Sequence, residues 1–176
     1  MQIQLALAQP EEFQLDLRIP SWSAATRVSI NNQVVAIPIA GLYLSLRRGW
    51  KNADTIDLEL DMAPHYWAGE RECFGYSSVY RGPILLAFDP VYNAMDPDAV
   101  PELDAHDMRF QLEETKRWLQ PWALYKVKAT NGSEVVLCDF ASAGMYGNYY
   151  RSWLPIQHLD PVAFQTSRPV WNNRPK

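Results

Sequence analysis

Two glutamates, Glu70 and Glu72, are the residues of this sequence whose type and spacing come nearest to a catalytic pair. Side chains two apart on a strand point to one face, so these carboxylates would lie about 7 Å apart. That distance is near the carboxylate spacings of retaining and inverting glycosidases. Acidic residues on the wet face of an antiparallel sheet show the same pattern without any catalysis, and this is the favoured interpretation.

The three histidines, His65, His106 and His158, are spaced at intervals that fit no metal pair on one helix or one strand. No serine lies in a Gly-x-Ser-x-Gly elbow, and no Gly-rich loop could hold a phosphate. A hydrolytic triad can assemble from distant positions, but nothing in the spacing supports one. The sequence predicts no catalytic residue, no metal ligand and no cofactor.

The two cysteines, Cys73 and Cys138, are single and widely spaced. They form neither a CxxC metal clip nor a redox motif. One disulfide and two buried thiols both remain open. The second is favoured, because free cysteine is among the most buried residue types.

Aromatic side chains are the best candidates for binding, because Trp and Tyr faces stack on sugar rings while neighbouring polar groups bond the hydroxyls. Trp118 and Trp122 bracket Leu119-Gln120-Pro121, and Trp67 lies among His65, Tyr66 and Glu70. We therefore name Trp67, Trp118 and Trp122 as candidate carbohydrate-binding residues. Packing is nevertheless the favoured interpretation for any single Trp of the chain, and it is the expectation for Trp22, Trp50 and Trp153.

Apolar and polar residues alternate with a period of two along residues 2–8, 13–19 and 56–62, the pattern of half-buried strands. Turn dipeptides at Asn31-Asn32 and Asn131-Gly132 separate apolar runs and predict tight hairpins. The sequence thus predicts an all-β protein, an antiparallel β-sandwich of jelly-roll-like type, with room for a second, smaller β subdomain. Only residues 112–119 have the pattern of a short helix.

The chain is expected to divide into a β-sandwich core at residues 1–88, a long connecting loop at 89–107, and further strands at 108–176. The loop is rich in Pro, Asp and Ala and has no sustained periodicity. The last segment would either complete the same sandwich or form the small second subdomain.

The net charge of −4 is spread along the chain without a block of Lys and Arg, so nucleic acid is not an expected partner. No stretch approaches the roughly 20 apolar residues that cross a bilayer, so no membrane is expected. Residues 1–8 lack a basic start followed by a long apolar run. A soluble chain without a visible export signal is the expectation.

A series of short motifs occurs in the order used by one family of glycoside hydrolases. It includes FQLDLRIPSW at residues 13–22, VYRGP at 79–83, DFASAG at 139–144 and YRSWL at 150–154. In this order the series resembles the β-sandwich region that follows the catalytic domain of β-L-arabinofuranosidases (glycoside hydrolase family 127). The resemblance covers roughly residues 2–155.

The resemblance implies an (α/α)6 catalytic barrel, with a cysteine nucleophile and a zinc ion held by Glu and Cys, that is absent from this chain. The family's Glu-x-Cys and Cys-Cys patterns do not occur in it. The expected function is therefore that of a non-catalytic accessory β-sandwich, which frames a helical catalytic domain in cis or in trans. A free-standing module that binds plant-type glycans, a self-sufficient glycosidase and a homodimer remain as alternatives.

Overall fold

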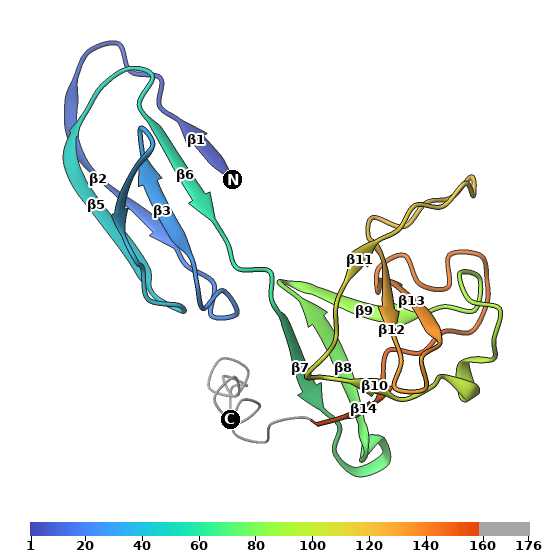
Figure 1. Ribbon diagram of the computed structural model, residues 1–176. Helices are drawn as coiled ribbons and strands as arrows, with labels where there is room; N and C mark the ends of the chain where they lie inside the picture. Colours follow the sequence, from blue (N-terminus) through green and yellow to red (C-terminus); the bar gives the residue numbers. More distant parts are fainter. Residues whose placement is uncertain (159–176) are drawn as a thin grey trace. The chain divides into compact units, whose positions relative to one another are not determined.

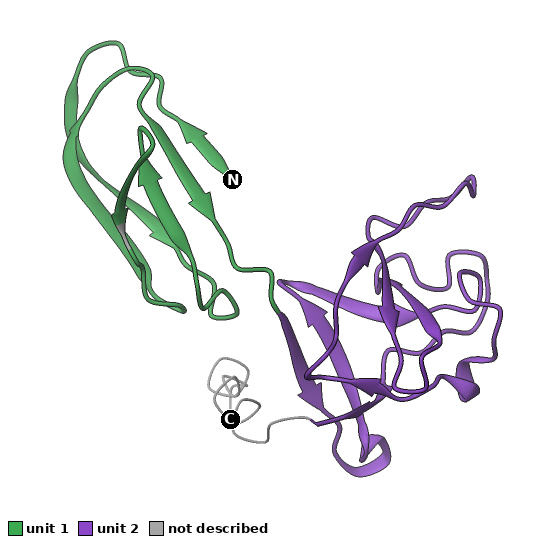
Figure 2. Cartoon of the chain, viewed as in Figure 1, with its two compact units in different colours: residues 1–63 green, residues 64–176 purple. Residues whose placement is uncertain are grey.

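The computed structural model describes residues 1–158 as strands, turns and two 3-10 turns, divided between two compact units. The units are Met1–Ala63 and Pro64–Lys176 (Figures 1 and 2). The strands of the first unit are β1 (Gln2–Gln4), β2 (Glu11–Arg18), β3 (Arg27–Ile30), β4 (Gln33–Ala36), β5 (Tyr43–Trp50) and β6 (Thr55–Glu59). The strands of the second unit are β7 (Pro64–Ala68), β8 (Tyr76–Arg81), β9 (Ile84–Phe88), β10 (Leu103–Asp104), β11 (Gln111–Leu112), β12 (Leu124–Lys128), β13 (Glu134–Asp139) and β14 (Leu154–Gln157).

The first unit packs a four-stranded sheet, in the order β1-β6-β3-β4, against the antiparallel pair β2-β5. Alternation along β2 decides which side chains face inward: Leu17 is buried, whereas Gln14 and Asp16 are exposed. The core includes Trp50, which is fully buried and donates its indole N–H to the Phe13 carbonyl oxygen at 3.1 Å. The buried indole thereby keeps the hydrogen bond that burial would otherwise cost it.

The β3-β4 hairpin turns at Asn31 and Asn32, whose φ angles are 50° and 65°. A two-residue turn of this kind needs positive φ at both positions, and Asn tolerates it better than most residues. The hairpin predicted at this dipeptide is confirmed.

The second unit is one mainly antiparallel sheet in the order β10-β14-β8-β9-β13-β12-β11. A further strand, β7, lies outside this order and pairs antiparallel with β8. The sheet curls (Figure 1), and buried side chains of β8, β9, β12, β13 and β14 form its core. The tight turn between β8 and β9 uses Gly82, at φ 56°, and Pro83. Within residues 1–158 the one parallel pair is β10 with β14, two strands that are neighbours in the sheet but far apart in sequence.

Two buried carboxylates order the long loops of the second unit. Asp89 accepts hydrogen bonds from the amides of Val91 and Gly144 and from the Asn148 side chain, at 2.6 to 2.9 Å. Asp139 accepts from the Ala123 amide at 3.0 Å and from both the amide and the hydroxyl of Ser142. Because a buried carboxylate is costly without such donors, these bonds fix the loops that supply them.

The all-β, predominantly antiparallel prediction is confirmed over residues 1–158. The short helix expected at 112–119 is wrong, because the Glu113 amide bonds the Leu124 carbonyl oxygen and extends the pairing of β11 with β12. None of the helices described is long and apolar enough to cross a membrane.

The compact units divide at Ala63 and Pro64, so β7 to β9 belong with the second unit, although they lie within the predicted 1–88 segment. Residues 89–107, the predicted connecting loop, contain β10 and a 3-10 turn at Pro97–Ala99. The predicted boundaries, like the jelly-roll-like connectivity, stay predictions. The end of the 108–176 segment, from residue 159, lies outside the described residues.

Candidate functional site

The acidic residues Glu70 and Glu72 do not lie on a strand. Glu70 precedes a 3-10 turn at Arg71–Cys73, and Glu72 lies within it. This turn is part of the connection between β7 and β8. The strand geometry that would set the two carboxylates on one face therefore does not apply.

Trp118 and Trp122 lie on the loop between β11 and β12, and both are highly exposed, at 83% and 77%. The Trp118 ring meets the Tyr146 ring edge to face, with centroids 6.2 Å apart. Both indoles are therefore largely in water and lie outside the buried core of the second unit.

The same loop is held in place by the rest of the second unit. The Tyr146 hydroxyl donates to the Leu119 carbonyl oxygen at 2.7 Å, and the Arg117 guanidinium donates to the Val91 carbonyl oxygen at 2.8 Å. At the far end, the Trp122 amide donates to the Ser142 hydroxyl at 3.3 Å. The indoles are thus carried by a backbone with fixed partners, which lowers the entropy that ligand binding must overcome.

The other tryptophans of the sequence analysis fall on different elements. Trp67 lies on β7 opposite Ser78 and is half-buried, so it does not share the loop of Trp118 and Trp122. Trp50 is fully buried, as its core assignment predicts. Trp22 and Trp153 are only half-buried.

An aromatic pocket of about 350 Å³ lies between the 3-10 turn before β8 and the segment that leads into β14. Its lining combines rings with a carboxylate, a thiol and a guanidinium: Glu72, Cys73, Tyr76, Tyr149, Tyr150, Arg151, Ser152 and Trp153. Arg151 covers the Tyr76 ring, with its guanidinium carbon 5.6 Å from the centroid, and pairs with Asp98 at 2.7 Å. Ring faces beside charged hydrogen-bonding groups suit a sugar.

Sequence reasoning did not find this pocket, although a signal for it exists. The run Tyr149-Tyr150-Arg151-Ser152-Trp153 mixes rings and polar groups without the alternation of a strand. Such a run fits a loop that presents its side chains, but its partners come from residues 72–76, which no local pattern connects to it.

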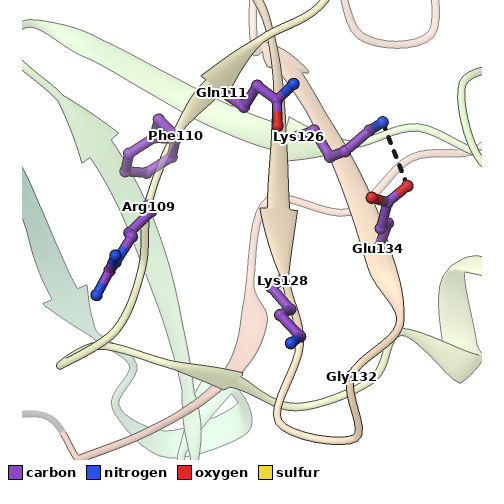
Figure 3. Close-up of a pocket in the computed structure, with 7 residues that line it drawn as sticks. All are labelled: Arg109, Phe110, Gln111, Lys126, Lys128, Gly132 and Glu134. Carbon is purple, nitrogen blue, oxygen red and sulfur yellow. Dashed lines mark ion pairs between the residues drawn. The ribbon is translucent and has the colours of Figure 1, made fainter.

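A second pocket, of about 480 Å³, is bordered by β11, β12 and β13 (Figure 3). It is lined by Arg109, Phe110, Gln111, Lys126, Lys128, Gly132 and Glu134. Lys126 pairs with Glu113 at 2.9 Å and with Glu134 at 3.2 Å, and hydrogen bonds to these carboxylates raise the Lys126 pKa. Since this charge is balanced by its neighbours, the pocket is a weak candidate for an anion.

Both cysteines are free thiols, but Cys73 is only half-buried, so the expectation of two buried core thiols is correct for Cys138 and wrong for Cys73. Cys138 is buried in β13, and burial raises its pKa to about 12. Over residues 1–158, neither cysteine belongs to a cluster of metal-ligating side chains. The cysteines therefore do not fit the zinc site of the arabinofuranosidase family, which needs several thiolates together.

Comparison with known proteins identifies the relatives of this fold. Residues 1–62 match the family model described as "Beta-L-arabinofuranosidase, GH127 middle domain". No curated protein sequence matches the chain.

Solved structures match over most of the chain. A glycoside hydrolase aligns with 89% of it at a TM-score of 0.75 and 19% identity. A GH127 β-L-arabinofuranosidase from Geobacillus stearothermophilus T6 aligns with 89% at 0.73 and 18% identity. A GH127 β-arabinofuranosidase aligns with 92% at 0.70 and 23% identity. At these identities the likeness shows the fold.

The matched region is only a part of each relative. The chain covers 30%, 28% and 30% of the three solved structures. The resemblance seen in the ordered motifs is thereby confirmed: this chain resembles part of a GH127 β-L-arabinofuranosidase, and its residues 1–62 match the middle domain of that family.

Proposed function

We propose that this chain is a non-catalytic accessory β-sandwich, which packs against the catalytic domain of a glycoside hydrolase and frames it. The observation that carries the proposal is that the chain matches less than a third of the length of three glycoside hydrolases, two of them GH127 enzymes. A domain that natively adjoins another domain also leaves an apolar surface when considered alone.

Exposed apolar side chains gather in one sequence segment of the first unit. Five large apolar side chains within residues 34–43 are more than half exposed: Val34, Ile37, Ile39, Leu42 and Tyr43. We call this set the hairpin patch. It begins on β4, an edge strand that pairs only with β3. Exposed edge strands with apolar side chains invite pairing or docking, so natural proteins cover them.

The hairpin patch favours a protein partner over a glycan. Its side chains are aliphatic apart from Tyr43, over whose ring Arg18 lies with its guanidinium carbon 5.6 Å from the centroid. Aliphatic surface gains free energy on burial but offers few hydrogen bonds for sugar hydroxyls.

The experiment mixes this chain with the catalytic domain of a GH127 β-L-arabinofuranosidase, produced separately. Binding is expected for the wild-type chain and is expected to be lost in the double variant Ile37→Lys/Ile39→Lys. The matched control is Gln9→Lys/Ala24→Lys, which adds the same charge at exposed residues outside the hairpin patch. Equal binding by both variants would contradict the proposed docking surface.

A homodimer could cover the same patch, since twofold self-association is the commonest symmetry. In that case the chain alone would sediment as a dimer, and Ile37→Lys/Ile39→Lys would convert it to a monomer. A monomeric wild-type chain that binds the catalytic domain excludes this alternative.

The second candidate function is a carbohydrate-binding module that recognises a plant-type glycan through Trp118 and Trp122. It is favoured by the high exposure of both indoles on a loop that Tyr146 and Ser142 hold in place. Trp67, which is half-buried on β7, would form a separate subsite. Titration calorimetry with arabinose-containing oligosaccharides should show binding that Trp118→Ala and Trp122→Ala abolish. Trp67→Ala should leave the binding of oligosaccharide at the loop of Trp118 and Trp122 unchanged.

A self-sufficient glycosidase is the remaining alternative, with Glu70 and Glu72 as its acids. The chain alone is expected to release no aryl group from aryl β-L-arabinofuranosides. Turnover that disappears in Glu72→Gln would overturn the non-catalytic assignment.

A further inference from the structure

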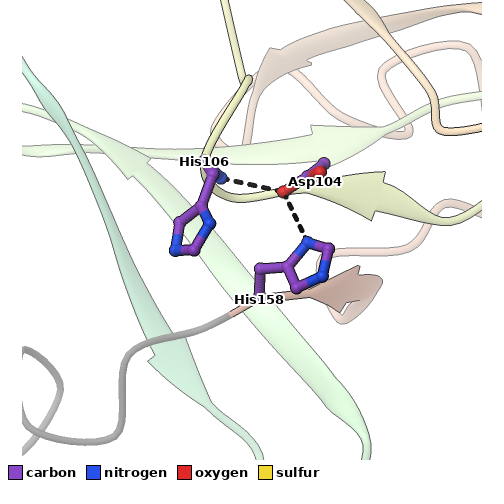
Figure 4. A group of neighbouring side chains, drawn as sticks. All are labelled: Asp104, His106 and His158. Carbon is purple, nitrogen blue, oxygen red and sulfur yellow. Dashed lines mark hydrogen bonds and ion pairs between the residues drawn. The ribbon is translucent and has the colours of Figure 1, made fainter.

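Three side chains of the types that bind transition metals meet in the second unit: Asp104, His106 and His158 (Figure 4). One ligand atom from each lies within 4.8 Å of the others. The His158 Nδ1 atom lies 3.0 Å from Asp104 Oδ1, and the two imidazole rings stack with centroids 5.3 Å apart. The chain has three histidines in all, so two of them gather at this one place.

The backbone brings these residues together through the parallel pairing of β10 with β14. Asp104 is the register partner of Gln157, and the Ala105 amide donates to the Gln157 carbonyl oxygen at 3.1 Å. His158 follows directly, with a φ of 57°. This left-handed conformation is uncommon outside glycine, although His adopts it more readily than most residues.

His106 is positioned by the turn that leaves β10. Its amide donates to Asp104 Oδ1 at 2.9 Å, which fixes the turn two residues beyond the carboxylate. Because the contacts to His106 and His158 both use Oδ1, Oδ2 could bind a metal while Oδ1 keeps its bond to the turn.

The donor set selects the class of metal. Two imidazoles and one carboxylate suit zinc, copper, iron or nickel, whereas calcium and magnesium prefer oxygen ligands alone. Two ligands of a tetrahedral zinc site lie about 3.4 Å apart when each is about 2.1 Å from the metal. His106 and His158 are exposed, so a small rotation of their side chains can close the remaining gap.

We propose that Asp104, His106 and His158 form a binding site for a divalent transition metal of the zinc class. The metal joins the turn after β10 to the end of β14, and water completes its coordination. β10 and β14 pair over only two residues, so the metal would strengthen a short contact. This donor set contains no thiolate, and the proposal stands independently of the accessory function.

The test titrates Zn²⁺ into the full chain without a histidine tag, by calorimetry. One equivalent is expected to bind, with an affinity that falls at least about tenfold in His106→Gln, in His158→Gln and in Asp104→Asn. The controls are His65→Gln and Cys73→Ser, which should bind as the wild type does. Ca²⁺ should not bind.

Co²⁺ in place of Zn²⁺ provides a readout of the ligands themselves. Visible absorption bands without an intense thiolate-to-cobalt band are expected, and His158→Gln should remove them. Circular dichroism of each variant without metal establishes that it is folded. Absence of Zn²⁺ binding by the folded wild type, or binding unchanged in His158→Gln, would overturn the proposal, as would loss of binding in Cys73→Ser.

Discussion

The Tyr146 hydroxyl binds both backbone polar groups of Leu119, donating to its carbonyl oxygen at 2.7 Å and accepting from its amide at 3.2 Å. The two residues are 27 positions apart. Leu119 lies between Trp118 and Trp122, so one side chain fixes the middle of the loop that presents both exposed indoles. The same Tyr146 ring contacts Trp118 and lies under the Arg117 guanidinium.

Tyr146→Phe should lower the free energy of unfolding by about 1 to 2 kcal/mol, because it removes two partly buried hydrogen bonds. Urea denaturation measures the loss, and hydrogen exchange of the Leu119 amide should become faster. Tyr149→Phe is the matched control, since Tyr149 is 69% exposed and should change stability by less than about 0.5 kcal/mol. Equal effects of the two variants would show that Tyr146 does not hold the loop.

Trp118→Ala should leave the stability of the chain within about 0.5 kcal/mol of wild type, because its indole is already in water. Trp50→Ala should cost about 3 to 5 kcal/mol, because that indole is fully buried and its N–H bonds the Phe13 carbonyl oxygen. Thermal or urea unfolding compares the two. A large loss for Trp118→Ala would mean that this indole is a packing residue and would weaken the case for a binding loop.

Cys73 should react with a thiol reagent in the folded protein, whereas Cys138 should react only after unfolding. Cys73 is half-exposed beside the aromatic pocket. Cys138 is fully buried, and its pKa is raised to about 12, first by burial and then by Asp89 and Asp139, so the reactive thiolate is scarce. The measurement is the number of thiols modified in the folded wild type and in folded Cys73→Ser. Fast labelling of folded Cys73→Ser would contradict the prediction that Cys138 is protected.

The stability of the second unit should decrease in alkali. Burial raises the pKa of Tyr66 from 10.0 to about 12, with a further contribution from Asp104. Because the folded pKa exceeds the unfolded one, this contribution to stability is complete below about pH 10 and is lost as the pH rises towards about 12. In urea denaturation across this range, Tyr66→Phe should show a shallower decline than wild type, and parallel declines would contradict the assignment.

Strands and hairpins were predictable wherever one local rule applied. β2 and β6 show strict alternation because one face of each strand packs on the core. The turns at Asn31-Asn32 and at Asn131-Gly132 lie where their dipeptides predict them, and Gly132 has a φ of 86°. These features depend on neighbours in sequence.

Features that depend on distant partners were not predictable. Residues 112–119 mix Leu and Trp with charged side chains, as an amphipathic helix does, but the pairing with β12 decides their conformation. The apolar run of β9 does not reveal that its partners are β8 and β13, which bind it into the second unit. The intervals between the histidines likewise conceal the contact of His106 with His158, because β10 and β14 create it.

The most direct test of the accessory function is sedimentation velocity of this chain mixed with the catalytic domain of a GH127 β-L-arabinofuranosidase. The account predicts a one-to-one complex that forms with the wild-type chain and with Gln9→Lys/Ala24→Lys but not with Ile37→Lys/Ile39→Lys. Independent sedimentation of the two wild-type proteins, or a complex that tolerates the lysines in the hairpin patch, would contradict it.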